Sequence, residues 1–226
     1  MTISQFCQKL WAHFRGLPKT IYFNFHYLPF SQAIKLPIML SHKVRLMECS
    51  GKIILPKKVH IRMIQIGFEG VGIFDAKYSR SIWQVSGTVI FNGTAAIGHG
   101  SKISVGKDAV LTIGNHFCIT AESSIVCQKE ITFGDDVLIS WENLFIDTDF
   151  HHVKQNGNAI NPPEKIIIGN HVWIGCRCTI LKGSTIPSNS ILGARSLVNK
   201  AVGDTERAII AGSPAKVLKS DVDWSE

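Results

Sequence analysis

The chain lacks the features of a membrane-spanning, secreted or disulfide-bonded protein. Among its 226 residues, no apolar run approaches the roughly 18 residues that a membrane-spanning helix needs. The first residues lack the uninterrupted apolar core of a signal peptide, so we expect a cytoplasmic protein. Of six cysteines, only Cys176 and Cys178 are close in sequence. We therefore expect no structural disulfide and no metal site, with Cys178 simply packed in the interior.

Acidic residues are scarce in the first part of the chain. Residues 1–62 hold ten Lys or Arg and one acid, whereas residues 63–226 hold 14 and 16. No helix-turn-helix, zinc-finger or RNA-recognition signature accompanies this charge, so we expect no nucleic-acid partner. Two interpretations remain: a solvated basic cap, or attraction to anionic lipid or a phosphate-bearing substrate.

The strongest pattern present is a ladder of large aliphatic residues spaced six apart. It comprises Ile168, Ile174, Ile180, Ile186, Leu192 and Val198, and an earlier stretch comprises Ile113, Ile119, Ile125 and Ile131, continuing after a two-residue slip as Phe133, Ile139 and Phe145. A second ladder of mostly smaller residues runs through Val172, Cys178, Ser184, Ser190, Ser196 and Val202. A period of six fits neither a helix nor a simple strand. It predicts an all-β solenoid of hexapeptide repeats, with large residues inside each face and small ones inside each corner.

The ladder divides the chain into three parts. We expect a basic N-terminal extension over residues 1–50, the solenoid over 51–204, and a C-terminal strand, turn and short helix or tail over 205–226. The ladder slips by two residues near 103–105, 111–113 and 131–133, which predicts slightly longer turns there.

An amphipathic helix is expected at the N-terminus, followed by irregular strands over residues 19–50. Its apolar face contains Ile3, Phe6, Cys7, Leu10, Trp11 and Phe14, and Gly16, Leu17 and Pro18 are expected to end it. That face either lies on a membrane surface or packs against another subunit.

One large interruption breaks the ladder. Phe145 and Ile168 are 23 residues apart, and the intervening text is rich in Asn-Gly, Asn-Pro and Pro-Pro. We expect residues 147–166 to form a loop that protrudes from the coil. In a rigid solenoid, such an insertion is the usual place for function. The loop opens with Asp147, Asp149, His151 and His152, and a histidine there is either a general base or merely solvated.

The C-terminal half of the chain resembles a known family. The resemblance rests on two segments, IIIGNHVWIGCRCTILKGSTIPSNSILGARSLVNK and the later AGSPAKVLK. They resemble the left-handed β-helix, hexapeptide-repeat acyltransferases, most of all the sugar O-acetyltransferases of capsular and cell-surface polysaccharides. The resemblance implies a left-handed parallel β-helix, acetyl-CoA as co-substrate, a sugar hydroxyl as acceptor and a homotrimer, with no metal.

The resemblance also implies roles for individual residues. Thr148-Asp149-Phe150-His151 matches the family's Thr-Asp-x-His segment, which makes His151 the general base and His152 its neighbour. The resemblance places the oxyanion donor at the backbone N–H of Cys176 and an acceptor contact near Glu122. Asp149 and Asp147 are the candidates to orient the imidazole.

Coenzyme A is expected in a groove between coils of two subunits. The residues implied for it are Trp173 at the thioester end, Gly193 and Ala194 beside the pantetheine arm, Ser213 and Pro214 at the nucleotide end, and Asn199, Lys200, Lys216 and Lys219 nearby. The lysines are expected to meet the phosphates by charge. Each active site is expected to pair His151 of one subunit with Trp173 of the next.

Two other functions remain open at this stage. A γ-class carbonic anhydrase shares the implied fold and needs three histidines on adjacent coils; His116 precedes His151 by 35 residues, but Asn156 and Gly157 occupy the place of the third. The other is a non-catalytic scaffold that binds a membrane or a partner through its basic N-terminus. A sugar nucleotidyltransferase is excluded, because 60 residues cannot form the extra nucleotide-binding domain.

Overall fold

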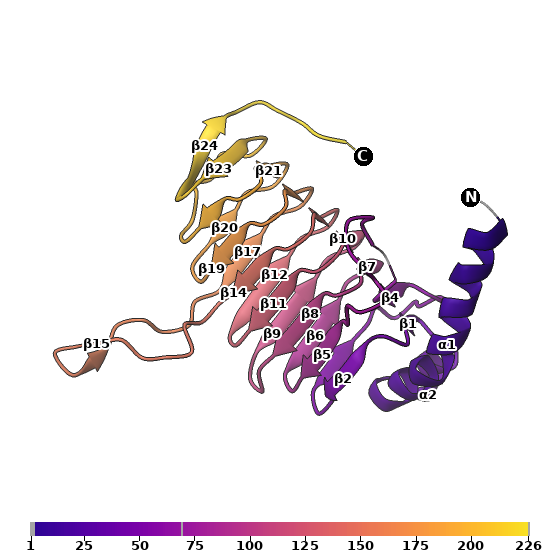
Figure 1. Cartoon of the computed structure of the whole chain (residues 1–226). Coiled ribbons are helices and arrows are strands. Elements are labelled where there is room, and N and C mark those ends of the chain that lie inside the picture. Colours follow the sequence, from indigo (N-terminus) through magenta and orange to yellow (C-terminus); the bar gives the residue numbers. More distant parts are fainter. Residues whose placement is uncertain (1–2, 69, 226) are drawn as a thin grey trace.

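Three β-sheets run along the molecule, parallel except for the last strand of the first sheet, and successive strands of the coils pass from one sheet to the next (Figure 1). The structure is a computed structural model that describes residues 3–68 and 70–225. The first sheet contains β1 (Ile38–Leu40), β4 (Ile64–Ile66), β7 (Ala95–Ile97), β10 (Phe117–Ile119), β13 (Leu138–Ile139), β18 (Trp173–Ile174), β21 (Ile191–Leu192), β23 (Ile209–Gly212) and β24 (Ala215–Lys219).

The other two sheets complete each three-sided coil. The second contains β2 (Arg45–Glu48), β5 (Ile82–Val85), β8 (Lys102–Val105), β11 (Ser124–Cys127), β14 (Leu144–Ile146), β19 (Thr179–Leu181) and β22 (Leu197–Val198). The third contains β3 (Lys52–Ile54), β6 (Thr88–Phe91), β9 (Val110–Ile113), β12 (Glu130–Phe133), β17 (Ile166–Ile168) and β20 (Thr185–Ile186). The parallel pairs begin with β1 and β2. The coils therefore start before residue 51, which is the start that the sequence analysis predicts.

The predicted ladder forms the interior of the stack. Every large residue of the ladder is buried, and in the second ladder all but the half-buried Val202 are buried. Equivalent residues stack in register, as Ile113, Phe133, Ile168 and Ile186 do along the third sheet. We expected longer turns at the two-residue slips, and this prediction is wrong. They lie inside β8, β9 and β12, where both Ile131 and Phe133 point inward, because these strands are long enough to carry two interior side chains.

The N-terminal helix is longer than the sequence indicates. Helix α1 spans Ile3–Tyr27 and is followed by α2 (Phe30–Ala33), so residues 19–27 and 30–33 are helical instead of irregular strands. Gly16 does not end the helix: it is buried against β1, where a Cβ would lie 2.1 Å from the carbonyl oxygen of Leu40. Glycine is required by this close approach of helix and strand. Of the predicted apolar face, Trp11 and Phe14 are exposed, whereas the side chains of Ile3, Phe6, Cys7 and Leu10 lie outside the described part of the structure.

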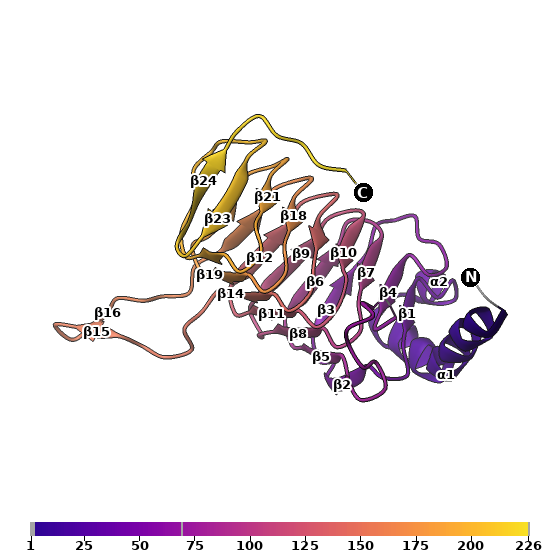
Figure 2. The same ribbon diagram turned by 45° about the horizontal axis from the view of Figure 1, so that its top comes forward.

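Helix α1 covers the open end of the first sheet (Figure 2). Asn24 donates from Nδ2 to the Ile38 carbonyl at 2.6 Å and accepts the Ile38 N–H at 3.1 Å. Thr20 Oγ1 accepts the Leu40 N–H at 2.9 Å. These side chains therefore satisfy the edge of β1, which no strand of the described residues covers on that side.

The C-terminal cap is a strand and not the expected helix. Strand β23 ends at Gly212, which has a positive φ; the chain then reverses at Ser213-Pro214, and β24 pairs antiparallel with β23. The free edge of β23 offers backbone donors and acceptors to residues 215–219, which a short exposed helix would leave unpaired. No helix in the described part of the chain is long and apolar enough to cross a membrane.

We expect Gly16→Ala to destabilise the protein, because the added methyl group must push α1 away from β1. The free energy of unfolding, measured by urea denaturation, should fall by about 1–3 kcal/mol. Gly72→Ala is the matched control, because a Cβ there meets no atom within 4 Å. Equal effects of the two substitutions would contradict the packing described for Gly16.

Candidate functional site

The segment between β14 and β17, residues 147–165, projects far from the stack and carries a small hairpin at its tip (Figure 1). Strands β15 (Lys154–Gln155) and β16 (Asn158–Ala159) pair antiparallel around Asn156-Gly157. Both turn residues have positive φ, the conformation that favours Asn-Gly in tight hairpins. Asn156-Gly157 is the position where a γ-class carbonic anhydrase would need its third histidine ligand. In this chain that position is the turn at the tip of the loop.

Asp147 anchors the start of the loop. Its side chain is buried, and its carboxylate accepts the backbone N–H groups of Gln128, Lys129 and Glu130 at 2.7, 2.8 and 2.8 Å. These three donors hold it against the corner of the preceding coil. The expectation that Asp147 orients the His151 imidazole is therefore not met, because its oxygens are committed to this corner.

His151 lies at the base of the loop, where the chain is tightly folded. Its N–H donates to the Asp149 carbonyl at 2.7 Å, and the Phe150 N–H donates to Thr148 Oγ1 at 3.0 Å. The imidazoles of His151 and His152 are exposed. Within residues 3–68 and 70–225, the ring of His151 has no hydrogen-bond partner. The ring therefore faces solvent at the loop base.

Asp149 is paired with a lysine that the sequence analysis missed. Its Oδ2 lies 2.6 Å from Lys182 Nζ and accepts a hydrogen bond from Asn161 Nδ2 at 2.7 Å. The hydrogen bond from Lys182, followed by that from Asn161, holds the pKa of Asp149 below its ordinary value. The expectation that Asp149 orients the His151 imidazole is not met, because this carboxylate oxygen faces Lys182 and Asn161.

Asn161 is the second residue that sequence reasoning missed. Its Nδ2 also donates to the His151 carbonyl at 2.8 Å, and its Oδ1 accepts the Val153 N–H at 2.6 Å. One amide thus joins both sides of the loop base. The Asn-Pro-Pro punctuation marked a turn at this position, but it gave no sign of these contacts.

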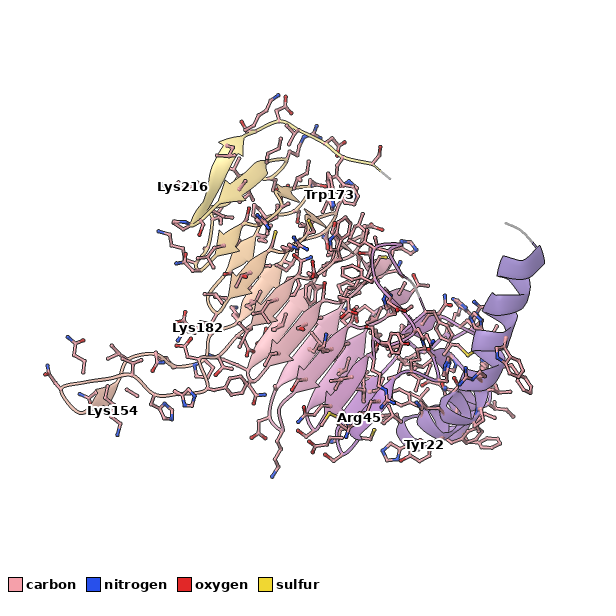
Figure 3. The ribbon with its side chains drawn as sticks, in the orientation of Figure 1. Tyr22, Arg45, Lys154, Trp173, Lys182 and Lys216 are labelled. Carbon is pink, nitrogen blue, oxygen red and sulfur yellow. The ribbon has the colours of Figure 1, made fainter. Side chains whose placement is uncertain are left out.

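A hollow of about 290 Å³ lies beside the loop base. Asp149, Lys182, Asn199 and Lys200 are among the residues that line it, so the structure brings two residues implied for coenzyme A next to the loop. Lys216 and Lys219 lie on β24, and Ser213 and Pro214 form the turn before it. Lys182 and Lys216 lie along the edge of the stack from which the loop projects (Figure 3).

Trp173 and Cys176 lie elsewhere on the same chain. Trp173 is on β18 in the first sheet, 38% exposed, with Nε1 3.4 Å from Ser140 Oγ. Cys176 lies at the corner between β18 and β19, and His151 lies beyond the far end of β14 in the second sheet. Figure 3 shows Trp173 and Lys182 at opposite edges of the stack. The width of the second sheet therefore separates His151 from Trp173 and Cys176.

The corner at Cys176 exposes backbone donors. Cys176 is half-buried, and its carbonyl accepts the Arg195 N–H at 2.9 Å. In the described part of the chain, the N–H groups of Cys176 and of Ala194, one coil further on, donate to no acceptor. Two amides on corners of successive coils are thus without an acceptor among the described residues.

Two other implied residues have structural roles in this chain. Gly193 is packed against the next coil, where a Cβ would lie 2.9 Å from Ala211 Cβ, so the stack itself requires glycine there. Glu122 is half-buried, lies 3.3 Å from Lys102 Nζ and accepts a hydrogen bond from Ser79. Among the described residues, no group of three or more His, Cys, Asp or Glu side chains is placed to hold a metal ion.

The comparisons with known proteins bear on this site. No protein-family model matches the chain. It is 35% identical over 111 residues to the galactoside O-acetyltransferase of Escherichia coli K12, a match that covers 47% of this chain and 52% of that protein. The chain thus spans about half the length of this curated relative.

Two solved structures are similar in sequence and fold. The polysialic-acid-specific acetyltransferase NeuO has a TM-score of 0.52 and 25% identity, covering 83% of this chain and 74% of that one. A hexapeptide-repeat-containing acetyltransferase of Vibrio cholerae O1 biovar eltor, solved with acetyl coenzyme A, has a TM-score of 0.50 and 28% identity, covering 60% and 72%. These matches confirm that the chain resembles the hexapeptide-repeat acetyltransferases of cell-surface sugars.

Proposed function

We propose that the chain is a CoA-dependent O-acetyltransferase that moves an acetyl group from acetyl-CoA to a sugar hydroxyl in polysaccharide or glycolipid assembly. The observation that carries this proposal is the exposed imidazole of His151, held at a loop base beside a lysine-lined hollow on a stack of parallel coils. The named activities of the similar proteins support it. In this proposal the stack is a left-handed β-helix, as in that family.

The residues on this surface suit acetyl-CoA. Lys182 and Lys200 line the hollow, and Lys216 lies further along the same edge, so cations are available for the phosphates of coenzyme A. Lys182 already neutralises Asp149, and Lys200 shares the hollow with the carboxylate of Glu164. The similar Vibrio cholerae protein was solved with acetyl-CoA. The thioester supplies an activated acetyl group.

His151 acts as the general base in this mechanism. Its imidazole accepts the proton of the acceptor hydroxyl as the oxygen forms a bond to the thioester carbonyl carbon. The N–H of Cys176, with that of Ala194 beside it, stabilises the oxyanion that develops. The carbon–sulfur bond then breaks, and His151 returns the proton to the departing thiolate.

The site is built by two subunits in this proposal. Because the width of the second sheet separates His151 from Trp173 and Cys176 in one chain, the two groups meet only when a second copy is placed alongside. A closed trimer has three such equivalent interfaces. The enzyme works in the cytoplasm, with its basic N-terminal end at the inner face of the membrane.

We expect His151→Ala to lower acetyl transfer by about 10²–10⁴-fold, since it removes the general base. The measurement is acceptor-dependent release of free thiol from acetyl-CoA, screened against sugars, nucleotide sugars and amino acids. His152→Ala is the matched control and should retain most of the activity. Full activity of His151→Ala would exclude this mechanism, and a lack of acyl transfer by the wild type would favour a non-catalytic scaffold.

A mixing experiment tests the shared site. His151→Ala and Trp173→Ala should each be inactive as homo-oligomers. Refolding them together at equal amounts should restore about a quarter of the sites, because a wild-type His151 then meets a wild-type Trp173 across an interface. Activity that stays at the level of the separate variants would place both residues in one subunit's site.

Asn161→Ala tests the positioning of the loop base. Loss of the hydrogen bonds from Asn161 should raise amide hydrogen exchange at residues 149–153 by roughly tenfold, corresponding to about 1–2 kcal/mol of local stability. Activity should fall through kcat, and the free energy of global unfolding should change little. Asn158→Ala, on the hairpin at the loop tip, is the control and should leave this exchange unaltered.

A further inference from the structure

A basic pocket of about 640 Å³ lies at the N-terminal end of the stack, far from the loop. Its lining includes six cationic side chains from three segments: Arg15, Lys19, Lys43, Arg45, Lys77 and Arg80. Among the described residues that line it, none carries a carboxylate. None of the ion pairs among the described residues includes any of the six. This concentration of one charge is therefore uncompensated within the described chain.

Backbone carbonyls hold part of this pocket in place. Lys19 Nζ donates to the His42 carbonyl at 2.7 Å and to that of Val44, and Lys43 Nζ donates to the carbonyl of Ala76. Burial, and then the neighbouring Arg80, lowers the pKa of Lys19. Within the described residues, Nδ1 of His42 is buried without a hydrogen-bond partner. Lys19 and Lys43 are thus held in place in the free protein, and a bound anion would offset the repulsion between Lys19 and Arg80.

An exposed aromatic surface lies beside the pocket. At about 100° per residue, the side chains of Trp11, Phe14, Ile21, Tyr22 and Phe25 fall within an arc of about 100° on α1. All five are exposed, whereas the opposite side of α1 packs on the stack through Phe23 and Asn24. Arg15 and Lys19 lie on the helix between the aromatic arc and the buried side, so the pocket borders the arc. A helix with this layout is suited to lie in a membrane interface.

The pocket is remote from the proposed acyl-transfer site. Four inter-strand steps of the second sheet separate β2 from β14. At about 4.8 Å per step, the pocket lies roughly 19 Å along the stack from the loop base. Figure 3 shows the same separation, with Tyr22 and Arg45 at one end and Lys182 and Lys216 towards the other. An anion in this pocket is therefore not at the reacting centre.

Charge favours a bilayer over a second copy of the chain as the occupant. Two copies that met through their aromatic arcs would also bring two basic pockets together, and like charges repel. An anionic bilayer instead supplies acyl chains to the arc and phosphate groups to the pocket. The single acid among residues 1–62 agrees with this complementarity.

We propose that the pocket formed by Arg15, Lys19, Lys43, Arg45, Lys77 and Arg80 binds phosphate headgroups of an anionic bilayer, while the aromatic arc of α1 inserts into the interface. This assigns a defined lipid site to the membrane contact proposed above. It does not depend on acetyl transfer. The solenoid then stands on the membrane by its N-terminal end.

Vesicle binding tests the site. The full chain is sedimented with phosphatidylcholine vesicles, with or without phosphatidylglycerol. Wild type should bind only the anionic vesicles, and the variant Arg45→Gln/Lys77→Gln/Arg80→Gln should bind about 100-fold more weakly. The charge-matched control Lys52→Gln/Lys57→Gln/Lys107→Gln changes exposed lysines outside the pocket and should lose less than about threefold, because salt screens distant charges.

Two further measurements make the outcomes distinct. Phe14→Ser/Phe25→Ser should weaken vesicle binding without any change in net charge, and Trp11 fluorescence should shift to the blue when wild type binds. Equal losses in the two glutamine triples would overturn the site in favour of diffuse charge. A Phe variant that alters oligomeric state but not vesicle binding would assign the arc to a second copy.

Soluble anions and activity complete the test. Inorganic diphosphate should compete only weakly with vesicles; tight diphosphate binding without vesicle binding would replace the lipid by a soluble ligand. The pocket triple should retain acetyl transfer to a soluble acceptor. If the wild-type protein transfers acetyl groups but does not bind anionic vesicles, only the lipid site is rejected. If it binds the vesicles but does not transfer acetyl groups, only the proposed function is rejected.

Discussion

The parallel hydrogen-bonded stacking of coils is the constraint on which the rest of this structure depends. Each strand must find a neighbour in the coil before it and in the coil after it, and each interior residue must fit the one above. The first sheet leaves an open edge at both ends. Thr20 and Asn24 of α1 supply side-chain donors and acceptors to β1, and the antiparallel strand β24 closes the opposite end. The two caps differ in kind because one edge meets a helix and the other meets the chain's own return.

The interior of the fold could be predicted from sequence, because burial in a repeating coil selects large aliphatic residues at fixed intervals. Ile168, Ile174 and Ile180 are buried as the ladder requires. The caps could not be predicted in the same way. Gly16 and Pro18 carry the local signature of a helix end, but contact with Leu40 decides the outcome, and nothing near Gly16 in sequence indicates that contact. Residues 215–219 likewise become a strand because the edge of β23 is available to them.

The candidate site also has one part that the sequence pattern predicts and another that depends on contacts between distant residues. The loop and the position of His151 follow from the break in the ladder, since a rigid stack must expel an insertion that does not fit its period. The interactions that hold the loop base do not follow from it. Lys182 reaches Asp149 from 33 residues away, and Asn161 joins Asp149 to His151. Asp147 is a candidate in sequence to orient the imidazole but is a buried anchor, because three backbone donors of the preceding corner converge on it. Such pairings depend on how coils are superimposed, which the spacing of residue types does not determine.

The regular stacking also fixes a length. Every coil between α1 and β14 adds one inter-strand spacing of about 4.8 Å, and the strands cannot slide because their side chains interlock in register. The number of coils therefore sets how far the loop base stands from the N-terminal end, independently of what either end binds. A related chain with one coil more or fewer would carry the same loop and the same cap at a different separation. Solenoids of this kind can thus change their reach in whole steps while both ends keep their chemistry.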